Sequence, residues 1–285
     1  MKIGRFLIDL VPTGVFALDG GAMFGVVPKA LWSKAYHPAD ELNRIPLAAQ
    51  PLLIRWEDNA VLVDTGNGSK MSDKFAEIYG IDKSKSDILQ ALNLYGVSPD
   101  QINTVILTHL HFDHAGGATI KADNEIIPTF PKAKYIVQKE HFKWAQSPTD
   151  KDRASFVSEN YMPLKQNGLI EFSEADEELF PGISVIEVNG HTQSMQLVKI
   201  TDAGQTLLYC ADMCATSAHI PVPYVMGYDN SPLTTIEEKK RILTQAYEED
   251  WLLAFEHDAF TQAAKLYRNE KGFHVGEKFE ITKFI

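Results

Sequence analysis

Cysteine is scarce in this sequence, in which Cys210 and Cys214 are the only two thiols. Small secreted domains usually depend on several disulfides, and two thiols four residues apart do not form such a framework. The low cysteine content favours a reducing compartment. We therefore expect a cytoplasmic protein in which both cysteines are small buried side chains.

Long apolar stretches are also missing. No run is long enough to span a membrane, and the N-terminal segment soon reaches Asp9 and Pro12 without a hydrophobic core. A membrane-spanning helix needs about 20 predominantly apolar residues, and a secretory signal needs an apolar core of its own. The sequence thus predicts neither a signal peptide nor a membrane partner.

Positive charge is in deficit, with 27 Lys and Arg against 38 Asp and Glu and a net charge of −11 at pH 7. A nucleic-acid-binding protein needs a basic face to neutralise phosphates. The balance therefore argues against a nucleic-acid partner and suits an acidic enzyme with a small-molecule substrate. The apolar fraction of 45% is ordinary for a globular domain and is enough for a large core.

Apolar periodicity divides the chain into alternating strands and helices. Residues 52–56 and 60–64 flank Glu57-Asp58-Asn59 and are expected to form a hairpin. Further strands are expected at 104–108, 135–137, 183–188, 195–200, 205–211, 251–255 and near 278–284. Helices are expected at 70–80, 86–95, 139–146 and 235–249.

Each half of the chain combines strands with helices, which indicates two mixed sheets packed face to face with helices outside. We expect a four-layer αββα sandwich that makes residues 1–285 a single domain. Residues 20–50 fit neither period, because Gly20–Pro28 is apolar and glycine-rich and Leu31 and Trp32 follow it. This segment is expected to be an irregular arm that roofs the active site, lies at a homodimer interface or packs on the core.

Residues 107–117, Leu-Thr-His-Leu-His-Phe-Asp-His-Ala-Gly-Gly, form a dense polar cluster directly after an apolar strand. Buried imidazoles and carboxylates need hydrogen bonds or a metal. At a strand end, residues two apart point the same way, so His109 and His111 can bind one cation together. Asp113 and His114 lie on the following turn and can face a second cation.

Three later residues, His191, Asp212 and His257, each follow an apolar strand. Functional side chains tend to gather where strands pass into loops, and a carboxylate has two oxygens with which to join two metals. The expected ligands form one group of His109, His111 and His191 and another of Asp113, His114 and His257, bridged by Asp212. Imidazole and carboxylate ligands favour zinc, and manganese, iron or cobalt also accept them.

Other residues are expected near this centre without binding metal. Asp64 ends a strand and should orient a ligand imidazole or the cluster loop by hydrogen bonds. His219 follows Asp212 by seven residues and is expected to support a ligand or contact substrate. Tyr228 and the arm residues Met23 and Phe24 are expected in the same two roles. The histidines at 37, 141 and 274 are interpreted as surface or structural residues.

The ordered set His109-x-His111-x-Asp113-His114, His191, Asp212 and His257 resembles the signature of the metallo-β-lactamase superfamily, over nearly the whole chain. Within it, residues 108–117 look like the quorum-quenching N-acyl-homoserine lactonases, and residues 19–34 look closest to their YtnP-type branch. The resemblance implies an αββα fold, two metal ions, usually zinc, and hydrolysis of a cyclic ester.

The chemistry of such a site predicts attack by a hydroxide that bridges the metals, because metal binding lowers the pKa of water from about 16 toward roughly 7. Asp113 is expected to orient this nucleophile while it binds metal. Many homoserine lactonases carry a tyrosine three residues after the bridging aspartate, where this sequence has Ala215. Either His219 or Tyr228 is expected to replace it, or the metals act alone.

The departure at Ala215 keeps other activities open. Residues 255–258 also suit phosphotriesterases and arylesterases of the methyl-parathion-hydrolase-like type, and a bridging hydroxide can attack phosphorus as well as carbon. A non-catalytic metal-binding protein is a third hypothesis. It is disfavoured, because loss of a ligand would be its mark and every expected ligand position is filled.

Overall fold

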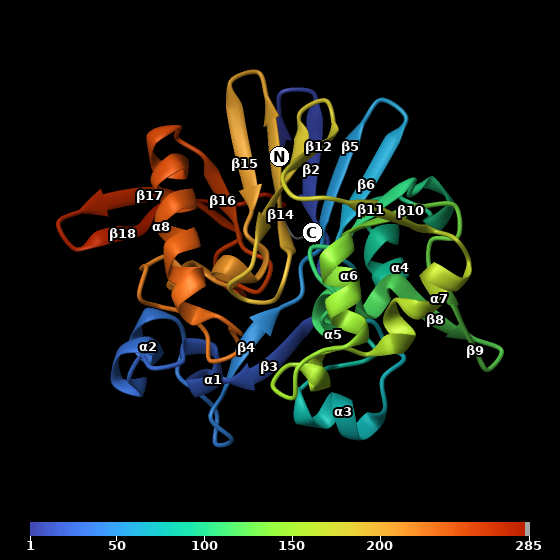
Figure 1. Cartoon of the computed structure of the whole chain (residues 1–285), viewed down its shortest axis with the longest axis horizontal. Coiled ribbons are helices and arrows are strands. Elements are labelled where there is room, and N and C mark those ends of the chain that lie inside the picture. Colours follow the sequence, from blue (N-terminus) through green and yellow to red (C-terminus); the bar gives the residue numbers. More distant parts are fainter. Residues whose placement is uncertain (283–285) are drawn as a thin grey trace.

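The computed structural model describes residues 1–282, and two seven-stranded mixed sheets lie at its centre (Figure 1). In spatial order, the first sheet contains β1 (Lys2–Ile3), β2 (Phe6–Leu10), β5 (Leu52–Trp56), β6 (Asn59–Val63), β7 (Thr104–Ile106), β10 (Lys134–Gln138) and β11 (Ile170–Ser173). The second contains β12 (Glu177–Phe180), β13 (Ile183–Val188), β14 (Met195–Asp202), β15 (Gln205–Tyr209), β16 (Leu252–Ala254), β17 (Ala263–Asn269) and β18 (Gly272–Phe279). The strands β6, β7, β10 and β11 are parallel neighbours, as are β15 and β16.

Helices cover the outer faces of both sheets. On the first sheet lie α4 (Ile88–Asn93), α6 (Lys139–Gln146) and α7 (Met162–Gln166), and on the second lies α8 (Pro232–Glu248). The four-layer αββα prediction is confirmed. The remaining elements are β3 (Val15–Asp19), β4 (Arg44–Ala48), β8 (Thr119–Ala122), β9 (Glu125–Pro128), α1 (Gly20–Phe24), α2 (Lys29–Ala35), α3 (Asp73–Ile78), α5 (Phe112–Ala115) and the 3₁₀ turns η1 (Pro99–Gln101), η2 (Gly116–Ala118), η3 (Arg153–Ser155), η4 (Ser158–Asn160), η5 (Ala211–Cys214) and η6 (Ser217–His219).

Side chains that point alternately to the two faces of each strand explain how the layers pack together. In β6, Val61 and Val63 face the core between the sheets, whereas Leu62 faces the outer helices. In β15, Tyr209 likewise faces inward and Leu208 packs toward α8. Since successive strand residues point to opposite faces, apolar residues at both positions produce strands that are buried on both sides.

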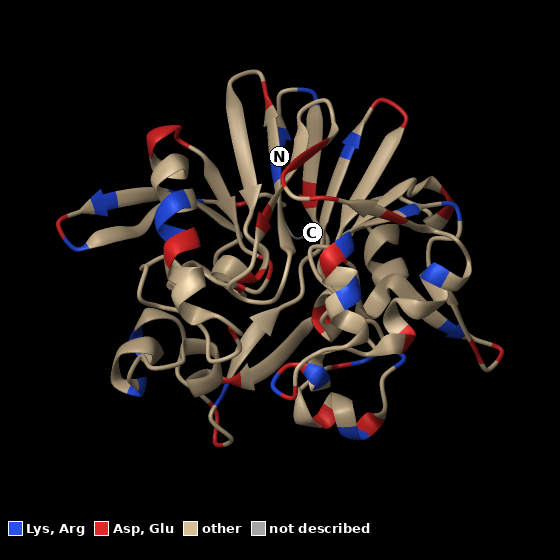
Figure 2. Cartoon of the chain, viewed as in Figure 1, with Lys and Arg blue, Asp and Glu red and all other residues tan. Residues whose placement is uncertain are grey.

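Charged side chains lie mainly outside these layers. Figure 2 shows both signs along α8, on the other outer helices and at the tips of hairpins, while the strands between them carry few. Among residues 1–282, no helix is both long and apolar enough to cross a membrane.

The C-terminal strands differ from the expectation. The single strand expected near 278–284 is instead the end of a hairpin, β17–β18, whose second strand stops at Phe279. Residues 283–285 lie outside the described residues. The first strand was missed because this edge hairpin carries partly exposed charged residues, so that its apolar alternation is weak.

The arm at 20–50 is more regular than its composition suggests. It contains α1 and α2, and β4 pairs with β3. Asp19 caps α1 by accepting a hydrogen bond from the Ala22 amide at 2.8 Å. A Cβ at Gly20 would lie 2.4 Å from the buried Trp32 ring, so the glycine permits the packing that holds the arm. The prediction of irregular structure was wrong because tertiary contacts decide these short elements.

Strand ends from both sheets gather at one edge of the sandwich. The chain leaves β6 and β7 of the first sheet in the same direction, and it leaves the parallel pair β15 and β16 of the second sheet together. In open sheets of this kind, ligands bind beyond the carboxyl ends of strands. This edge therefore holds the candidate site.

Candidate metal centre

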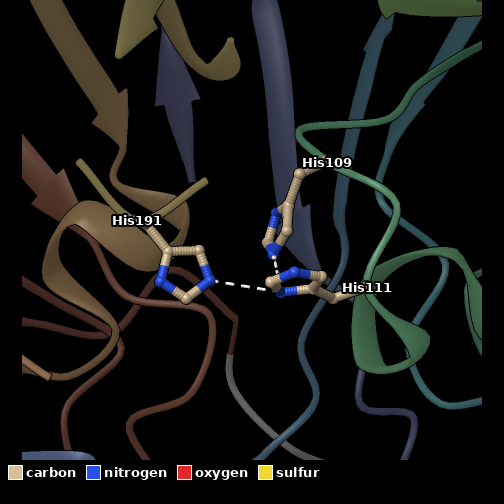
Figure 3. A group of neighbouring side chains, drawn as sticks. All are labelled: His109, His111 and His191. Atoms are coloured by element: carbon tan, nitrogen blue, oxygen red, sulfur yellow. Dashed lines mark hydrogen bonds between the residues drawn. The ribbon is translucent and has the colours of Figure 1, made fainter. Parts of the chain in front are cut away.

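The first group of converging side chains consists of His109, His111 and His191 (Figure 3). His109 and His111 follow β7, and His191 lies between β13 and β14. Nδ1 of His111 is 3.1 Å from Nε2 of His109 and 3.2 Å from Nε2 of His191. In a tetrahedral zinc site, with Zn–N distances of about 2.0–2.1 Å, ligand nitrogens lie roughly 3.3 Å apart. The three nitrogens are thus spaced as ligands of one cation.

Hydrogen bonding alone does not account for this packing. The two contacts lead from His111 Nδ1 to different nitrogens, and one ring N–H can point along only one of them. Burial, followed by the neighbouring histidines, lowers the pKa of His109 and of His111 well below the usual 6.5. Both rings are therefore neutral, which is the form that binds metal.

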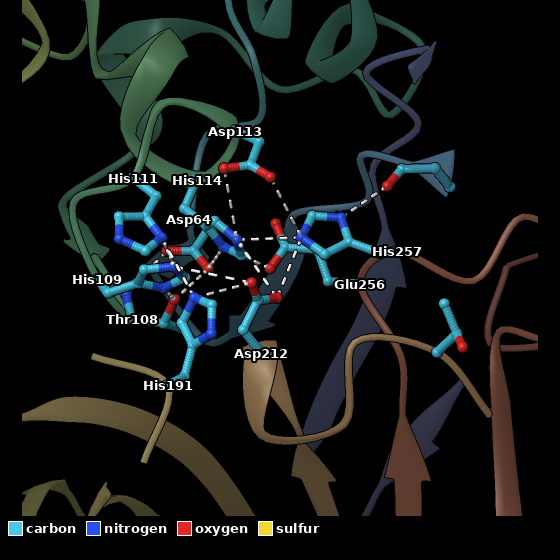
Figure 4. Close-up of polar contacts among 12 residues, drawn as sticks. Asp64, Thr108, His109, His111, Asp113, His114, His191, Asp212, Glu256 and His257 are labelled. Atoms are coloured by element: carbon cyan, nitrogen blue, oxygen red, sulfur yellow. Dashed lines mark hydrogen bonds and ion pairs between the residues drawn. The ribbon is translucent and has the colours of Figure 1, made fainter. Parts of the chain in front are cut away.

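The second group consists of Asp113, His114 and His257 (Figure 4). Asp113 and His114 belong to the single turn α5, and His257 follows β16. Nε2 of His114 and Nε2 of His257 are 3.0 Å apart. The Asp113 carboxylate lies 3.9 Å from the first and 3.8 Å from the second. One possible ligand atom from each of the three residues thus lies within 4.8 Å of the other two.

Asp212, in η5, lies between the two groups. Its Oδ2 is 3.2 Å from His191 Nε2, and its Oδ1 is 3.2 Å from His257 Nε2. Burial raises the pKa of Asp212, but His114, His257 and His191 outweigh it and hold that pKa well below its usual value. Asp212 is thus an ionised carboxylate with one oxygen toward each group, as a bridging ligand requires.

Asp64 holds the cluster from behind. Its carboxylate accepts hydrogen bonds from the Thr108 amide at 2.8 Å and the Thr108 hydroxyl at 2.6 Å, and it lies 3.0 Å from His114 Nδ1. The Asp64 backbone is left-handed, with φ of 59°, and its amide donates to Ile106 at 2.9 Å. One side chain thereby contacts both the loop after β7 and a candidate ligand.

Two acidic residues in the site escaped the sequence analysis. Asp229 is 3.0 Å from His191 Nδ1, and Glu256 is 2.9 Å from His114 Nδ1. Burial raises the pKa of Glu256 to about 7. Glu256 adjoins a candidate ligand in sequence, which could have indicated it, whereas Asp229 lies 38 residues from its partner and no spacing pattern leads to it.

Two imidazoles of the region, those of His257 and His141, contact backbone atoms. His257 Nδ1 is 2.9 Å from the Ala48 carbonyl. His141 is fully buried, accepts a hydrogen bond from the Leu110 amide at 2.8 Å and contacts the Gln193 carbonyl at 2.7 Å. His141 therefore links the segment after β7 to the segment that carries His191, and it is a structural rather than a surface residue. Outer partners of this kind fix the orientation of ligand imidazoles.

A cavity lies over the two groups. Its floor includes Asp113, Asp212 and three of the histidines. Its walls combine apolar side chains with phenols and other polar groups, namely Leu18, Met23, Phe112, Met226, Tyr79, Tyr228, Lys151, Asp152 and Ser155. Burial, with neighbouring carboxylates, raises the pKa of Tyr79 and of Tyr228, so both remain protonated donors.

The four supporting residues expected from the sequence divide into two pairs. Met23 and Tyr228 line the cavity. Phe24 and His219 lie behind it, with stacked rings 4.6 Å apart, and His219 Nε2 is 2.8 Å from the Met23 carbonyl. His219 therefore supports the arm residue Met23 and is not part of the cavity lining.

Ala215 brings no polar group to the site. It is buried in the cluster that anchors the arm, and its carbonyl accepts a hydrogen bond from the His257 amide at 3.1 Å. Two tyrosines, Tyr79 and Tyr228, line the cavity instead.

Comparison with known sequences places most of the chain in one family. The sequence model described as Metallo-beta-lactamase superfamily matches residues 45–256. An N-acyl homoserine lactonase of Bacillus cereus is 27% identical over 229 residues, which cover 76% of this chain and 83% of that protein. The N-acyl homoserine lactonase AiiB of Agrobacterium fabrum is 27% identical over 260 residues, covering 83% and 87%.

Solved structures show the same fold. A probable metal-dependent hydrolase from Staphylococcus aureus superposes with a TM-score of 0.88 at 31% identity, covering 98% of this chain and 100% of that one. AidC, a dizinc quorum-quenching lactonase in complex with a product, superposes with a TM-score of 0.81 at 18% identity, covering 98% and 97%. The family resemblance seen in the sequence is confirmed.

Proposed function

Because the chain belongs to the metallo-β-lactamase superfamily and is a metal-dependent hydrolase of that family, we propose that it is a dinuclear lactonase. Its substrate class is the N-acyl-homoserine lactones, and its role is quorum quenching. The observation that carries the proposal is the pair of three-residue groups joined by Asp212 at the floor of one cavity. The lactonases of Bacillus cereus and Agrobacterium fabrum support the choice of substrate.

The donor set fits two divalent ions. His109, His111 and His191 would hold one, and Asp113, His114 and His257 the other, with Asp212 between them. Imidazole and carboxylate donors favour zinc, and the dizinc protein AidC has the same fold. When bound, two such ions supply a hydroxide nucleophile at neutral pH and polarise the carbonyl that it attacks.

The chain's own groups would orient the substrate around that chemistry. The Asp113 carboxylate lies at the cavity floor, where it can accept a hydrogen bond from the nucleophile. The phenols of Tyr79 and Tyr228 face the same cavity as O–H donors. We assign Tyr228 to donate a hydrogen bond to the ester oxygens. Ala215 has no side-chain donor and cannot do so.

The walls of the cavity suit an acylated ring. Leu18, Met23 and Met226 give it an apolar side, which is compatible with a hydrocarbon chain. Lys151 and Ser155 are among the polar residues that line it and can pair with an amide. We propose that the chain is one domain whose arm supplies part of this wall through Met23.

Location and assembly complete the proposal. The two buried free thiols, Cys210 and Cys214, support a reducing, cytoplasmic compartment. Exposed side chains at Val26 and Leu31 on the arm support a homodimer, which sedimentation in solution would test.

A hydrolysis panel on the zinc-loaded protein tests the proposed function. Acyl-homoserine lactones, phosphotriesters, β-lactams and thioesters are compared, with the metal-free protein as control. We expect ring opening of the lactones to be the fastest reaction, read by mass spectrometry as addition of one water. Rapid phosphotriester turnover without lactone turnover would overturn the lactonase assignment.

A further inference from the structure

Lys239 is a fully buried lysine in α8, the outer helix of the second sheet. Its neighbour Lys240, by contrast, is 56% exposed and pairs with Glu237. A buried ammonium is costly unless its hydrogens are satisfied. The partners of Lys239 are backbone carbonyls: Nζ donates to His219 at 2.5 Å, to Pro221 at 2.9 Å and to Tyr224 at 2.8 Å.

The number of hydrogens matches the number of acceptors. An ammonium has three N–H donors, and the three carbonyls belong to one short segment, residues 219–224. A neutral amine would leave one of these contacts without a hydrogen. The segment therefore folds around a single positive charge, much as carbonyl oxygens surround a small monovalent cation.

The same segment continues into the wall of the cavity. We call residues 219–229 the wall loop. Met226 and Tyr228 line the cavity, and Asp229 lies against His191. The Gly227 amide donates to Ala22 at 2.8 Å, which fastens the wall loop to the arm.

We propose that the Lys239 ammonium is a positioning group, a built-in monovalent cation around which the wall loop is wrapped. The proposal assigns the three carbonyls of His219, Pro221 and Tyr224 as a cation site that can accept a primary alkylammonium ion in place of the lysine. Lys239 would thereby set the shape of the cavity without touching substrate or metal.

Lys239→Ala with n-propylammonium tests this directly, because that ion replaces the atoms that the substitution removes. Hydrogen exchange of wall-loop amides is followed by mass spectrometry. We expect exchange at least about tenfold faster than in the wild type, because a hydrogen bond to a charged group contributes more than a tenfold change in local opening. Propylammonium should restore slow exchange, whereas tetramethylammonium, which has no N–H, should not.

Two further variants complete the design. Lys239→Met fills the space of the lysine side chain without a hydrogen-bond donor, so its exchange should be fast and unresponsive to propylammonium. Lys240→Ala should exchange like the wild type. Wild-type exchange rates in either Lys239 variant, or fast exchange in Lys239→Ala that propylammonium does not slow, would overturn the proposal.

A kinetic measurement rests on the proposed function and is kept separate. In Lys239→Ala loaded with metal to the wild-type level, KM for an acyl-homoserine lactone should rise several-fold, and propylammonium should lower it again. An unchanged KM would contradict the positioning role. If the wild type opens no lactone, the proposed function fails, while the exchange experiment still decides the role of Lys239.

Discussion

The two groups of the candidate metal centre differ in the charge that surrounds them. The first half is formed by His109, His111 and His191, and the second half by Asp113, His114 and His257. Around the first, imidazoles dominate, and burial lowers the pKa of His109 and His111. Thr108 Oγ1, a neutral group, lies 3.1 Å from His109 Nδ1. The rings of His109 and His111 are therefore neutral before any cation arrives. These two residues need not lose protons before they bind metal.

The second half is rich in carboxylates. Burial lowers the pKa of His257, but Asp212 outweighs it and raises that pKa to about 9. Burial also lowers the pKa of His114, but the neighbouring carboxylates, Glu256 foremost, outweigh it and raise that pKa well above 6.5. In the metal-free protein the raised pKa values favour protonated His114 and His257. Metal binding to this group is therefore coupled to the release of protons.

Removal of Asp212, which lies between the two groups, should weaken metal binding in both. We expect Asp212→Ala to lower kcat/KM by at least about 10³-fold, because several kcal/mol of metal-dependent stabilisation would be lost. Metal analysis should show less than the wild-type content. The exposed Asp100 provides the control: Asp100→Ala should keep metal and activity. Full activity in metal-poor Asp212→Ala would contradict a metal-dependent reaction at this site.

Removal of Asp229, the carboxylate behind His191, should weaken metal binding in the first half only. Asp229→Ala leaves His191 Nδ1 without its carboxylate, and such outer partners contribute roughly 10–100-fold in metal affinity. Zinc titration against a chelator should then show one weakened step and one unchanged step. Weakening of both steps to the same degree would mean that the two halves do not bind independently.

A change of pH should sharpen the difference between the halves. With the pKa of His257 raised to about 9, a metal must displace a proton from His257 at lower pH, and a second from His114, whose pKa is also raised. Affinity in the second half should therefore fall by about tenfold or more per pH unit well below pH 9. In the first half, His109 and His111 have pKa values lowered well below 6.5 and should add no such loss of affinity. Stepwise zinc titrations at several pH values would measure this, and parallel slopes would count against it.

The smallest effect on activity is expected from a change in the cavity wall, at Tyr228. Tyr228→Phe removes one phenol from the cavity wall and should lower kcat about five- to tenfold, the usual worth of one neutral hydrogen bond. Metal content and both titration steps should stay at the wild-type level. Tyr79→Phe is the matched comparison, and an unchanged kcat in Tyr228→Phe would remove that residue from the reaction.

Local sequence was sufficient for much of this centre. His109, His111, Asp113 and His114 lie close together because a strand end and one turn of helix place them there. The hairpin of β5 and β6 was also predictable, since alternation and a polar turn are local signals. Asp64 could be linked to the cluster because it ends a strand of the same sheet.

Residues that act across long separations could not be found in this way. Asp229 and Lys239 reach their partners through loops and helices, and no periodicity relates them. The arm shows the same limit, since the fit of Gly20 against Trp32 exists only after folding.

The sequence by itself determined the αββα class and the donor chemistry of the candidate ligands, because strand periodicity and donor type are properties of short segments. Only the tertiary structure decided which oxygen of Asp212 faces which group, which acids lie behind His114 and His191, and how the wall loop is held. Those features depend on distances between segments that are remote in the chain, and packing alone sets such distances.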